Sequence, residues 1–180
     1  MLNMEPIVVL SGRAGVGKTS VAAELVARMP ALHAQTSAMI LKIRPNSIRT
    51  RIGLQEAGNS LDVETDFSWI ARETLDVIRE NPHHPIIVDA VRVPRQVSKI
   101  RTAIPTHVIH IHLTASRPKI IARFMARKRI IDDGLAYETI EVDDSEKWNT
   151  ELAAISDLVV DTDYRSPSET AATVIDFTKR

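Results

Sequence analysis

The chain has 180 residues, 44% of them hydrophobic and none of them cysteine, and its 23 basic side chains balance 23 acidic ones. This length predicts a single domain over residues 1–180 that buries roughly 70% of the surface of its unfolded chain. The lack of cysteine excludes a disulfide framework and a thiolate metal site, and zero net charge argues against a surface that coats nucleic acid. No apolar run approaches the ~20 residues of a membrane helix, and the N-terminus carries no signal-like segment. We therefore expect a cytoplasmic monomer or homodimer with neither a membrane nor a nucleic-acid partner.

A glycine-rich octapeptide follows the first predicted strand. Residues 7–10 form a continuous apolar run, which is typical of a strand buried on both faces of a parallel sheet. Residues 12–19 read Gly-Arg-Ala-Gly-Val-Gly-Lys-Thr and fit the pattern G-x-x-x-x-G-K-S/T. Residues 21–29 carry apolar side chains at helical spacing, and Pro30 ends that run. A strand, a glycine loop and a helix in this order indicate a phosphate-binding loop, so we predict a bound nucleotide.

Each position of this loop has a physical role in binding phosphate. The glycines allow positive φ angles and bring bare backbone N–H groups to the phosphate oxygens. Lys18 places a cation within reach of the β- and γ-phosphates, and the Thr19 hydroxyl is placed to ligate Mg²⁺. The nucleotide is therefore predicted to contact Gly12, Arg13, Ala14, Gly15, Val16, Gly17, Lys18, Thr19 and Ser20.

Four further segments read as core strands, with helical patterns between them. Strands are predicted at 31–34, 85–89, 106–113 and 157–161, and helices at 67–78, 116–129 and 167–177. Strands that alternate with helices predict a parallel sheet with right-handed crossovers, in a three-layer α/β/α sandwich. Because ligands bind such sheets beyond the carboxyl ends of the strands, one crevice is expected to gather residues 12–20, 89–92, 114–117 and 161–163.

Asp89 ends the apolar strand at 85–89, and Arg92 follows three residues later. A carboxylate at this point lies beside the phosphate loop, where it can hold Mg²⁺ through water or accept a proton from an attacking group. The alternative role for Asp89 is a cap for the following turn. Arg92 can reach an anionic acceptor in the same crevice, or it can be an ordinary surface arginine.

A cluster of cations ends the helix predicted from Ser116. Arg123 and Arg127 lie one turn apart on this helix, and residues 130–147 beyond it are rich in Asp and Glu. A basic helix end followed by a flap is what a phosphoryl-transfer lid needs, because its arginines must arrive on closure and expel water. The alternative is that these cations stabilise the helix C-terminus. As a group, we interpret them as part of a lid at approximately 127–148.

The segment 49–58 places two arginines and an amide between the first strand and the strand at 85–89. We expect an acceptor-binding insertion at approximately 37–66. In this insertion Arg49 and Gln55 are predicted to contact the acceptor, together with Arg92 outside it.

Two aromatic features have a structural and a functional interpretation. Trp69 can stack on a base, but core packing is favoured for a tryptophan in a helix. His110 and His112 could form a zinc pair on the strand at 106–113, yet no third ligand is placed and cysteine is absent. Core histidines with satisfied hydrogen bonds are therefore favoured.

Three of these motifs together resemble the P-loop nucleoside monophosphate kinases, and the similarity spans nearly the whole chain. The form of the loop at 12–19 is closer to theirs than to that of motor or helicase ATPases. Residues 54–61, which read L-Q-x-x-G-x-x-L, are similar with Trp69 to the acceptor region of deoxynucleoside monophosphate kinases, and residues 87–92 resemble the strand-end Asp and Arg of that group. The chain also resembles the nucleotide kinase-like domain sometimes fused to adenylosuccinate synthetase.

The resemblance implies a five-stranded parallel sheet, Mg·ATP as the phosphoryl donor, and a nucleotide-like small-molecule acceptor. It places the lid arginines at Arg123 and Arg127, and the adenine-contacting loop at Asp161, Thr162 and Asp163. The expected catalytic residues are then Lys18, Asp89, Arg123 and Arg127, with Thr19 and Asp89 as the Mg²⁺ ligands.

We expect a kinase that transfers the γ-phosphoryl group of ATP to a nucleoside or deoxynucleoside monophosphate. One alternative is a kinase of a nucleotide-like alcohol such as dephospho-coenzyme A, in which Asp89 acts as a general base. The other is a regulatory module or a stand-alone NTPase that has no acceptor.

Overall fold

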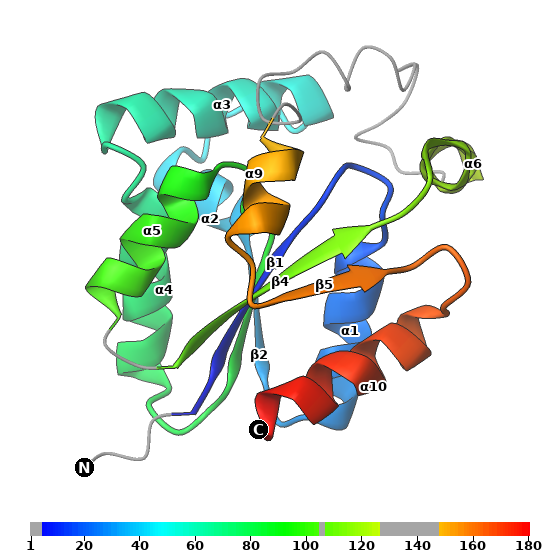
Figure 1. Ribbon diagram of the computed structural model, residues 1–180. Coiled ribbons are helices and arrows are strands. Elements are labelled where there is room, and N and C mark those ends of the chain that lie inside the picture. The colour runs from blue at the N-terminus through cyan, green and yellow to red at the C-terminus, as the bar shows by residue number, and fades with distance from the viewer. Residues whose placement is uncertain (1–4, 105–106, 127–147) are drawn as a thin grey trace.

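The computed structural model describes residues 5–104, 107–126 and 148–180. Its centre is a sheet of five parallel strands in the order β2-β3-β1-β4-β5 (Figure 1). The strands are β1 (Ile7–Ser11), β2 (Leu32–Gln35), β3 (Ile86–Asp89), β4 (Val108–Thr114) and β5 (Leu158–Asp161). The five predicted strands are therefore confirmed, and so is the parallel α/β fold class.

Helices cover both faces of the sheet and complete the three layers (Figure 1). On one face, α1 (Lys18–Arg28) and α10 (Pro167–Thr178) share a core with Val8, Leu10 and Ile111 of the sheet. The opposite face is covered by α2 (Thr36–Ile43), α3 (Arg51–Glu64), α4 (Trp69–Glu80), α5 (Pro94–Ala103) and α9 (Asn149–Ala154). α6 (Arg117–Ala126) follows β4 and packs on the loop after β1 through Ile120 and Phe124.

The inner strands and the edge strand β5 differ in how far their side chains are buried. β1 and β3 lie inside the sheet and every one of their residues is buried, whereas in the edge strand β5 only Val160 is buried. Strands covered on both faces need apolar side chains at every position. Since all the strands are parallel, their carboxyl ends meet at one edge, which brings the loop after β1 next to Asp89.

The insertion predicted at 37–66 consists mainly of α2 and α3. Its apolar side chains, such as Ile40 and Leu61, belong to the same core as α4 and α5, so this part of the chain is an integral piece of one helix layer. The lid predicted at 127–148 lies, apart from Trp148, outside the described residues. Within the described ranges, no helix has the length and apolar character needed to cross a membrane.

Candidate active site

Three glycines shape the loop between β1 and α1. Gly12, Gly15 and Gly17 have φ angles of 131°, 85° and 108°, a region that favours glycine. Two of them are also crowded. A Cβ on Gly12 would overlap the carbonyl oxygen of Leu113, and a Cβ on Gly15 would lie 2.8 Å from the carbonyl oxygen of Ile120. The loop therefore lies tightly against β4 and α6, with its backbone amides near the first turn of a helix, as phosphate binding requires.

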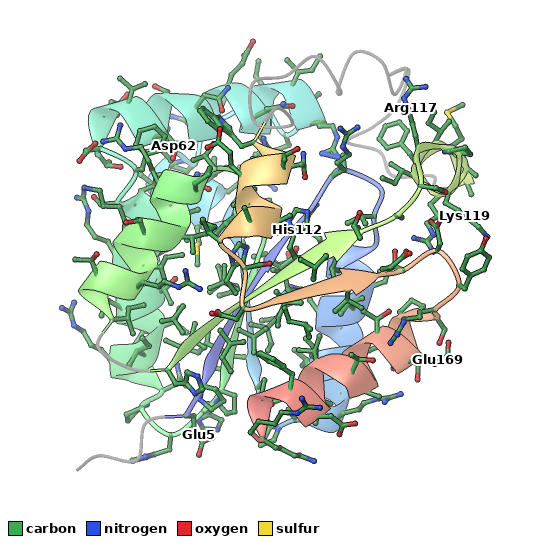
Figure 2. All side chains as sticks on the ribbon, in the orientation of Figure 1. Glu5, Asp62, His112, Arg117, Lys119 and Glu169 are labelled. Atoms are coloured by element: carbon green, nitrogen blue, oxygen red, sulfur yellow. The ribbon has the colours of Figure 1, made fainter. Side chains whose placement is uncertain are left out.

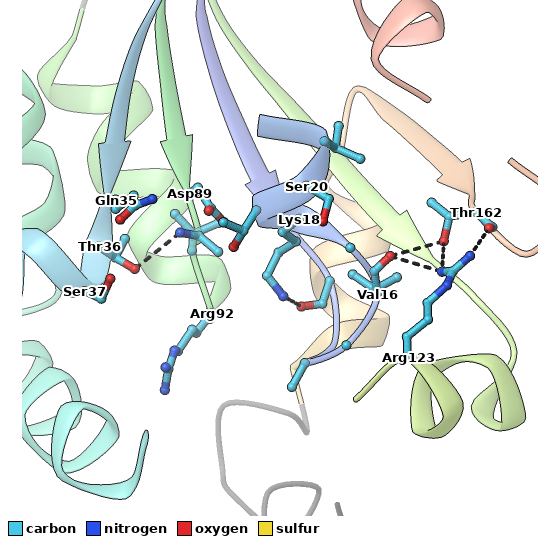
Figure 3. A pocket seen from close by; sticks show the side chains of 18 of the residues that line it. Val16, Lys18, Ser20, Gln35, Thr36, Ser37, Asp89, Arg92, Arg123 and Thr162 are labelled. Atoms are coloured by element: carbon cyan, nitrogen blue, oxygen red, sulfur yellow. Dashed lines mark hydrogen bonds between the residues drawn. The ribbon is translucent and has the colours of Figure 1, made fainter. Parts of the chain in front are cut away.

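A cavity of about 870 Å³ opens at the carboxyl ends of the strands, with the loop at its base (Figure 3). One wall comes from α6 and the turn after β5, and the other from α2, α3 and the residues after β3. We call these walls the donor side and the acceptor side. Of the residues predicted from the sequence, those that line the cavity are Gly12, Ala14, Gly15, Val16, Gly17, Lys18, Thr19, Ser20, Gln55, Asp89, Arg92, Arg123 and Thr162.

Lys18 and Thr19 lie where the loop meets α1. The Lys18 ammonium donates hydrogen bonds to the carbonyl oxygens of Gly12 (2.5 Å) and Arg13 (2.9 Å), which hold it across the loop. Thr19 lines the cavity beside it. Within the part of the chain that the structure describes, no group of three or more acidic, histidine or cysteine side chains could hold a metal alone. Thr19 and Asp89 both line the cavity, and their oxygens are of the type that binds a Mg²⁺ whose other ligands are phosphate oxygens and water.

Asp89 is the last residue of β3, and only 7% of its surface is exposed. Figure 3 places it between the end of β2 and the loop that carries Lys18. Its Oδ2 lies 3.3 Å from His33 Nε2 on the neighbouring strand β2. A carboxylate in this position can hold metal-bound water or take a proton from an acceptor, so the geometry is compatible with both predicted roles.

Arg123 reaches the loop from α6. Its guanidinium donates to the side-chain oxygen of Thr162 (2.8 Å), to the Thr162 carbonyl (2.5 Å) and to the Val16 carbonyl (3.3 Å) (Figure 3). Arg123 links the loop to the end of β5, because α6 packs directly on the loop. Its role in a closing lid stays a prediction. Its predicted partner, Arg127, lies outside the described residues.

The turn after β5 is fixed by its own carboxylates. Asp161 Oδ1 accepts a hydrogen bond from the backbone N–H of Asp163 (2.9 Å), and Asp163 Oδ1 accepts one from the N–H of Ser116 (2.7 Å). Of the three residues predicted to contact adenine, Thr162 lines the cavity, and the two aspartates stabilise the turn instead. Arg165 extends the same wall. The sequence analysis missed it because its local pattern is that of any surface arginine.

Arg51 and Arg92 bring positive charge to the acceptor side, where both line the cavity. Arg51 is the first residue of α3, and its guanidinium carbon lies 5.9 Å from the centre of the Phe124 ring on α6. Arg49, in contrast, is exposed and lies outside the lining, so the structure gives Arg51 the place that we expected for Arg49. The sequence held a signal for this. Arg51 is one helical turn from Gln55, so the two share a helix face.

A buried carboxylate supports the acceptor side from below, between α3 and α5 (Figure 2). Asp62 accepts hydrogen bonds from the Trp69 indole (2.7 Å) and the Gln96 carboxamide (2.8 Å), and the Gln96 oxygen accepts one from the backbone N–H of Arg92 (2.8 Å). Burial raises the pKa of the Asp62 carboxyl, although the hydrogen bonds from Gln96 and Trp69 and the charge of Arg92 oppose this. Trp69 is thus a core residue, as favoured, and its network fixes the backbone of Arg92. The sequence analysis did not identify Asp62 or Gln96.

The two histidines of β4 lie in the core beneath the loop. Ser11, the last residue of β1, has its Oγ 2.6 Å from His110 Nε2 and 2.9 Å from His112 Nδ1. Burial is the main cause that lowers the pKa of both imidazoles to about 4, and nearby positive charges, including that of Lys18 beside His112, lower it further. Both histidines are therefore neutral at physiological pH. Their place in the core is confirmed, but the expected hydrogen bonds are incomplete, since the buried Nδ1 of His110 has no hydrogen-bond partner among the described residues.

No family model matches this chain, and neither does any curated protein. Solved structures do match. The chain is similar to a tunicamycin resistance protein from Deinococcus radiodurans, with a TM-score of 0.66 and 19% identity over 96% of this chain and 95% of that one. A shikimate kinase from Bacteroides thetaiotaomicron (12% identity) and the Mycobacterium tuberculosis APS kinase in complex with AMPPNP and APS (13%) both match with a TM-score of 0.64, over 98% of this chain and 99% of theirs. These likenesses establish the fold, a three-layer sandwich around a parallel sheet that this chain shares with those structures.

Proposed function

We propose that this chain is an ATP-dependent phosphotransferase that moves the γ-phosphoryl group to a nucleoside monophosphate, foremost a deoxynucleotide. The observation that carries the proposal is the division of the cationic side chains of the cavity into two sets. Lys18, Arg123 and Arg165 belong to the loop and donor side, whereas Arg51 and Arg92 come from the acceptor side. An acceptor phosphate brings negative charges of its own, and the arginine fork binds phosphate in a bidentate manner.

The donor side contributes mainly electrostatic stabilisation, since phosphoryl transfer asks little covalent chemistry of a protein. Backbone N–H groups of residues 13–19 and the Lys18 ammonium would surround the β- and γ-phosphates. Thr19 and Asp89 would hold Mg²⁺, which supplies positive charge to the β- and γ-phosphate oxygens when it is bound. Arg123 attaches the loop to the end of β5, which would hold the cradle in one shape around the phosphates.

The acceptor side positions the attacking oxygen. The Arg51 guanidinium contacts Phe124, and the backbone of Arg92 is fixed by Gln96, so neither arginine has to be ordered fully when the acceptor binds. Gln55 is buried on the same wall and offers a carboxamide to the sugar or base. The similarity of residues 54–61 and 87–92 to deoxynucleoside monophosphate kinases supports the same kind of acceptor.

The test is incubation with Mg·ATP and a panel of ribo- and deoxynucleoside monophosphates, with ADP and free phosphate as readouts. We expect ADP formation that depends on one class of monophosphate and is abolished by Lys18→Ala, while the exposed Lys179→Ala control keeps the wild-type rate. Free phosphate released at one rate whatever acceptor is added would contradict the kinase and support an NTPase without an acceptor. Near-full transfer by Lys18→Ala would contradict the assignment of the site.

A kinase of a nucleotide-like alcohol, such as dephospho-coenzyme A, is the second candidate. It is favoured by the buried Asp89 carboxylate, which lies beside Lys18 where a hydroxyl would need a general base. A phosphate acceptor needs no such base. The acceptor panel should therefore also contain a nucleotide-like alcohol such as dephospho-coenzyme A. If Asp89→Asn severely reduces transfer at saturating Mg²⁺ but retains ATP binding, the result would favour an alcohol as the acceptor.

A further inference from the structure

The carboxyl end of β2 contacts the carboxyl end of β3 through side chains that the proposed mechanism does not yet use. In the parallel register of the two strands, His33 pairs with Ile87 and Gln35 with Asp89. Since side chains alternate along a strand, these four lie on one face of the sheet, the face that packs against α1 through Ile87. Gln35 also lines the cavity (Figure 3).

Two hydrogen bonds run in series from Gln35 to Asp89. Gln35 Nε2 lies 3.4 Å from His33 Nδ1, and His33 Nε2 lies 3.3 Å from Asp89 Oδ2. With the Gln35 carboxamide in this orientation its nitrogen donates, so Nδ1 of His33 accepts. In a neutral imidazole the proton is then on Nε2, which donates it to the carboxylate. The contact with Gln35 thus selects one tautomer of His33, the tautomer that can hold Asp89.

A third contact fixes the backbone at the same place. The N–H of Ala90, the residue after Asp89, donates to the side-chain oxygen of Thr36, the residue after Gln35, at 3.3 Å. The Asp89 side chain and the peptide that follows it are therefore both held from the end of β2. These contacts restrict the rotation of a carboxylate that is itself almost fully buried.

We propose that Gln35 and His33 are positioning residues that orient Asp89 toward the metal-nucleotide complex. With Oδ2 bonded to His33, Oδ1 would be the oxygen that accepts a hydrogen bond from a metal-bound water. The inference rests on the proposed function for the role of Asp89, but it concerns binding of the metal-nucleotide complex and does not depend on which acceptor is used. Partners that orient a metal ligand typically change metal affinity 10- to 100-fold when they are removed, and we expect the lower end of this range because Asp89 would act through a metal-bound water.

The first test reads the tautomer directly. We expect imidazole ¹⁵N shifts of the uncomplexed protein to show His33 protonated at Nε2 only, and Gln35→Leu to produce a mixture of tautomers. His84, which is exposed at the opposite end of β3, is the matched control and should not respond to Gln35→Leu. A His33 protonated at Nδ1 in the wild type, or one unchanged by Gln35→Leu, would overturn the relay.

The second test measures binding of a non-hydrolysable ATP analogue by calorimetry over a Mg²⁺ titration. We expect His33→Ala to raise the Mg²⁺ concentration at half-saturation about tenfold, with binding of the metal-free analogue unchanged. His33→Gln, which keeps a donor near the position of Nε2, should recover most of this loss. In an Asp89→Asn background, His33→Ala should have no further effect, because the two residues act as one unit.

The outcomes separate this inference from the proposed function. An equal loss of binding with and without Mg²⁺, or the same loss in the Asp89→Asn background, would show that His33 only stabilises the edge of the sheet. Wild-type protein that shows the expected Mg²⁺ dependence but no acceptor-dependent ADP would contradict the proposed function and leave the relay intact. If His33→Ala does not fold, Gln35→Leu takes its place in the Mg²⁺ titration. It should raise the Mg²⁺ concentration at half-saturation, whereas His33→Gln should stay near the wild-type value, and an equal loss with and without Mg²⁺ would again contradict the relay.

Discussion

The two sides of the cavity are built in different ways. On the donor side, Lys18, Arg123 and Thr162 all bond to backbone carbonyl oxygens of residues 12–16, so the cradle is mostly main chain held by a few side chains. On the acceptor side, side chains from β2, from α3 and from the residues after β3 meet above a buried network around Asp62. In a site that uses mainly backbone groups, the backbone torsions determine which residue types are allowed. In a site that uses mainly side chains, the packing of separate helices and strands determines which side chains meet.

The largest expected effect tests the backbone geometry of the donor side. Gly12→Ala would place a Cβ against the Leu113 carbonyl at a positive φ, whereas Gly17→Ala has a positive φ but no neighbour within 4 Å among the described residues. We expect Gly12→Ala to lose detectable ATP binding and more than about 3 kcal/mol of unfolding free energy, and Gly17→Ala to lose about 1 to 2 kcal/mol. Calorimetry and urea unfolding measure both, and equal losses would contradict the proposed crowding at β4.

Acid should act on the histidines beneath the donor side. The unfolded chain binds protons at His110 and His112 near pH 6.5, and the folded chain only near pH 4. Between these values the unfolded state holds more protons, so the unfolding free energy falls as pH decreases and is unaffected by these groups above pH 6.5. The expected loss is on the order of 3 kcal/mol for each imidazole. His112→Gln should reduce the slope of unfolding free energy against pH, and an unchanged slope would contradict the burial of its neutral form.

Charge removal on the acceptor side should be selective. Arg51→Ala and Arg92→Ala should each raise KM for the acceptor roughly 10- to 100-fold, the equivalent of one lost charge-assisted phosphate contact, with little change in KM for ATP. Arg49→Ala is the matched comparison because that arginine is exposed and outside the lining. If Arg49→Ala raised KM for the acceptor as much as Arg51→Ala does, Arg49 would contact the acceptor, as the sequence alone predicts.

The smallest expected effect concerns the support below the acceptor side. Trp69→Phe removes the indole donor to Asp62 and keeps most of the ring in the core, so we expect a loss of about 1 kcal/mol in unfolding free energy. The KM for the acceptor should stay within about twofold, since the indole is buried in this network. A large rise in KM with unchanged stability would show instead that Trp69 stacks on the base.

The fold was largely predictable because its signals are local. Continuous apolar runs predicted the buried strands β1 and β3, and a mostly apolar run interrupted by two histidines predicted β4; parallel pairing then followed from the helices between them. The loop was predictable for a similar reason, since each glycine, Lys18 and Thr19 has its role within eight consecutive residues. Arg49 was chosen over Arg51 because the N-cap of α3 at Thr50, which fixes the helix start and therefore its faces, was not recognised.

By itself, the sequence determined that a nucleotide-binding loop follows a buried strand in a parallel α/β sheet, because backbone amides, glycine torsions and a single lysine act over a few bonds. Only the tertiary structure decided that Arg123 contacts the loop, that Asp62 bonds the Gln96 that fixes the backbone of Arg92, and that His33 contacts Asp89. The hydrogen bonds of Arg123 to Val16, Asp62 to Gln96 and His33 to Asp89 join residues 34 to 107 positions apart and depend on how helices and strands pack. Periodicity along the chain carries no information about such distances in space.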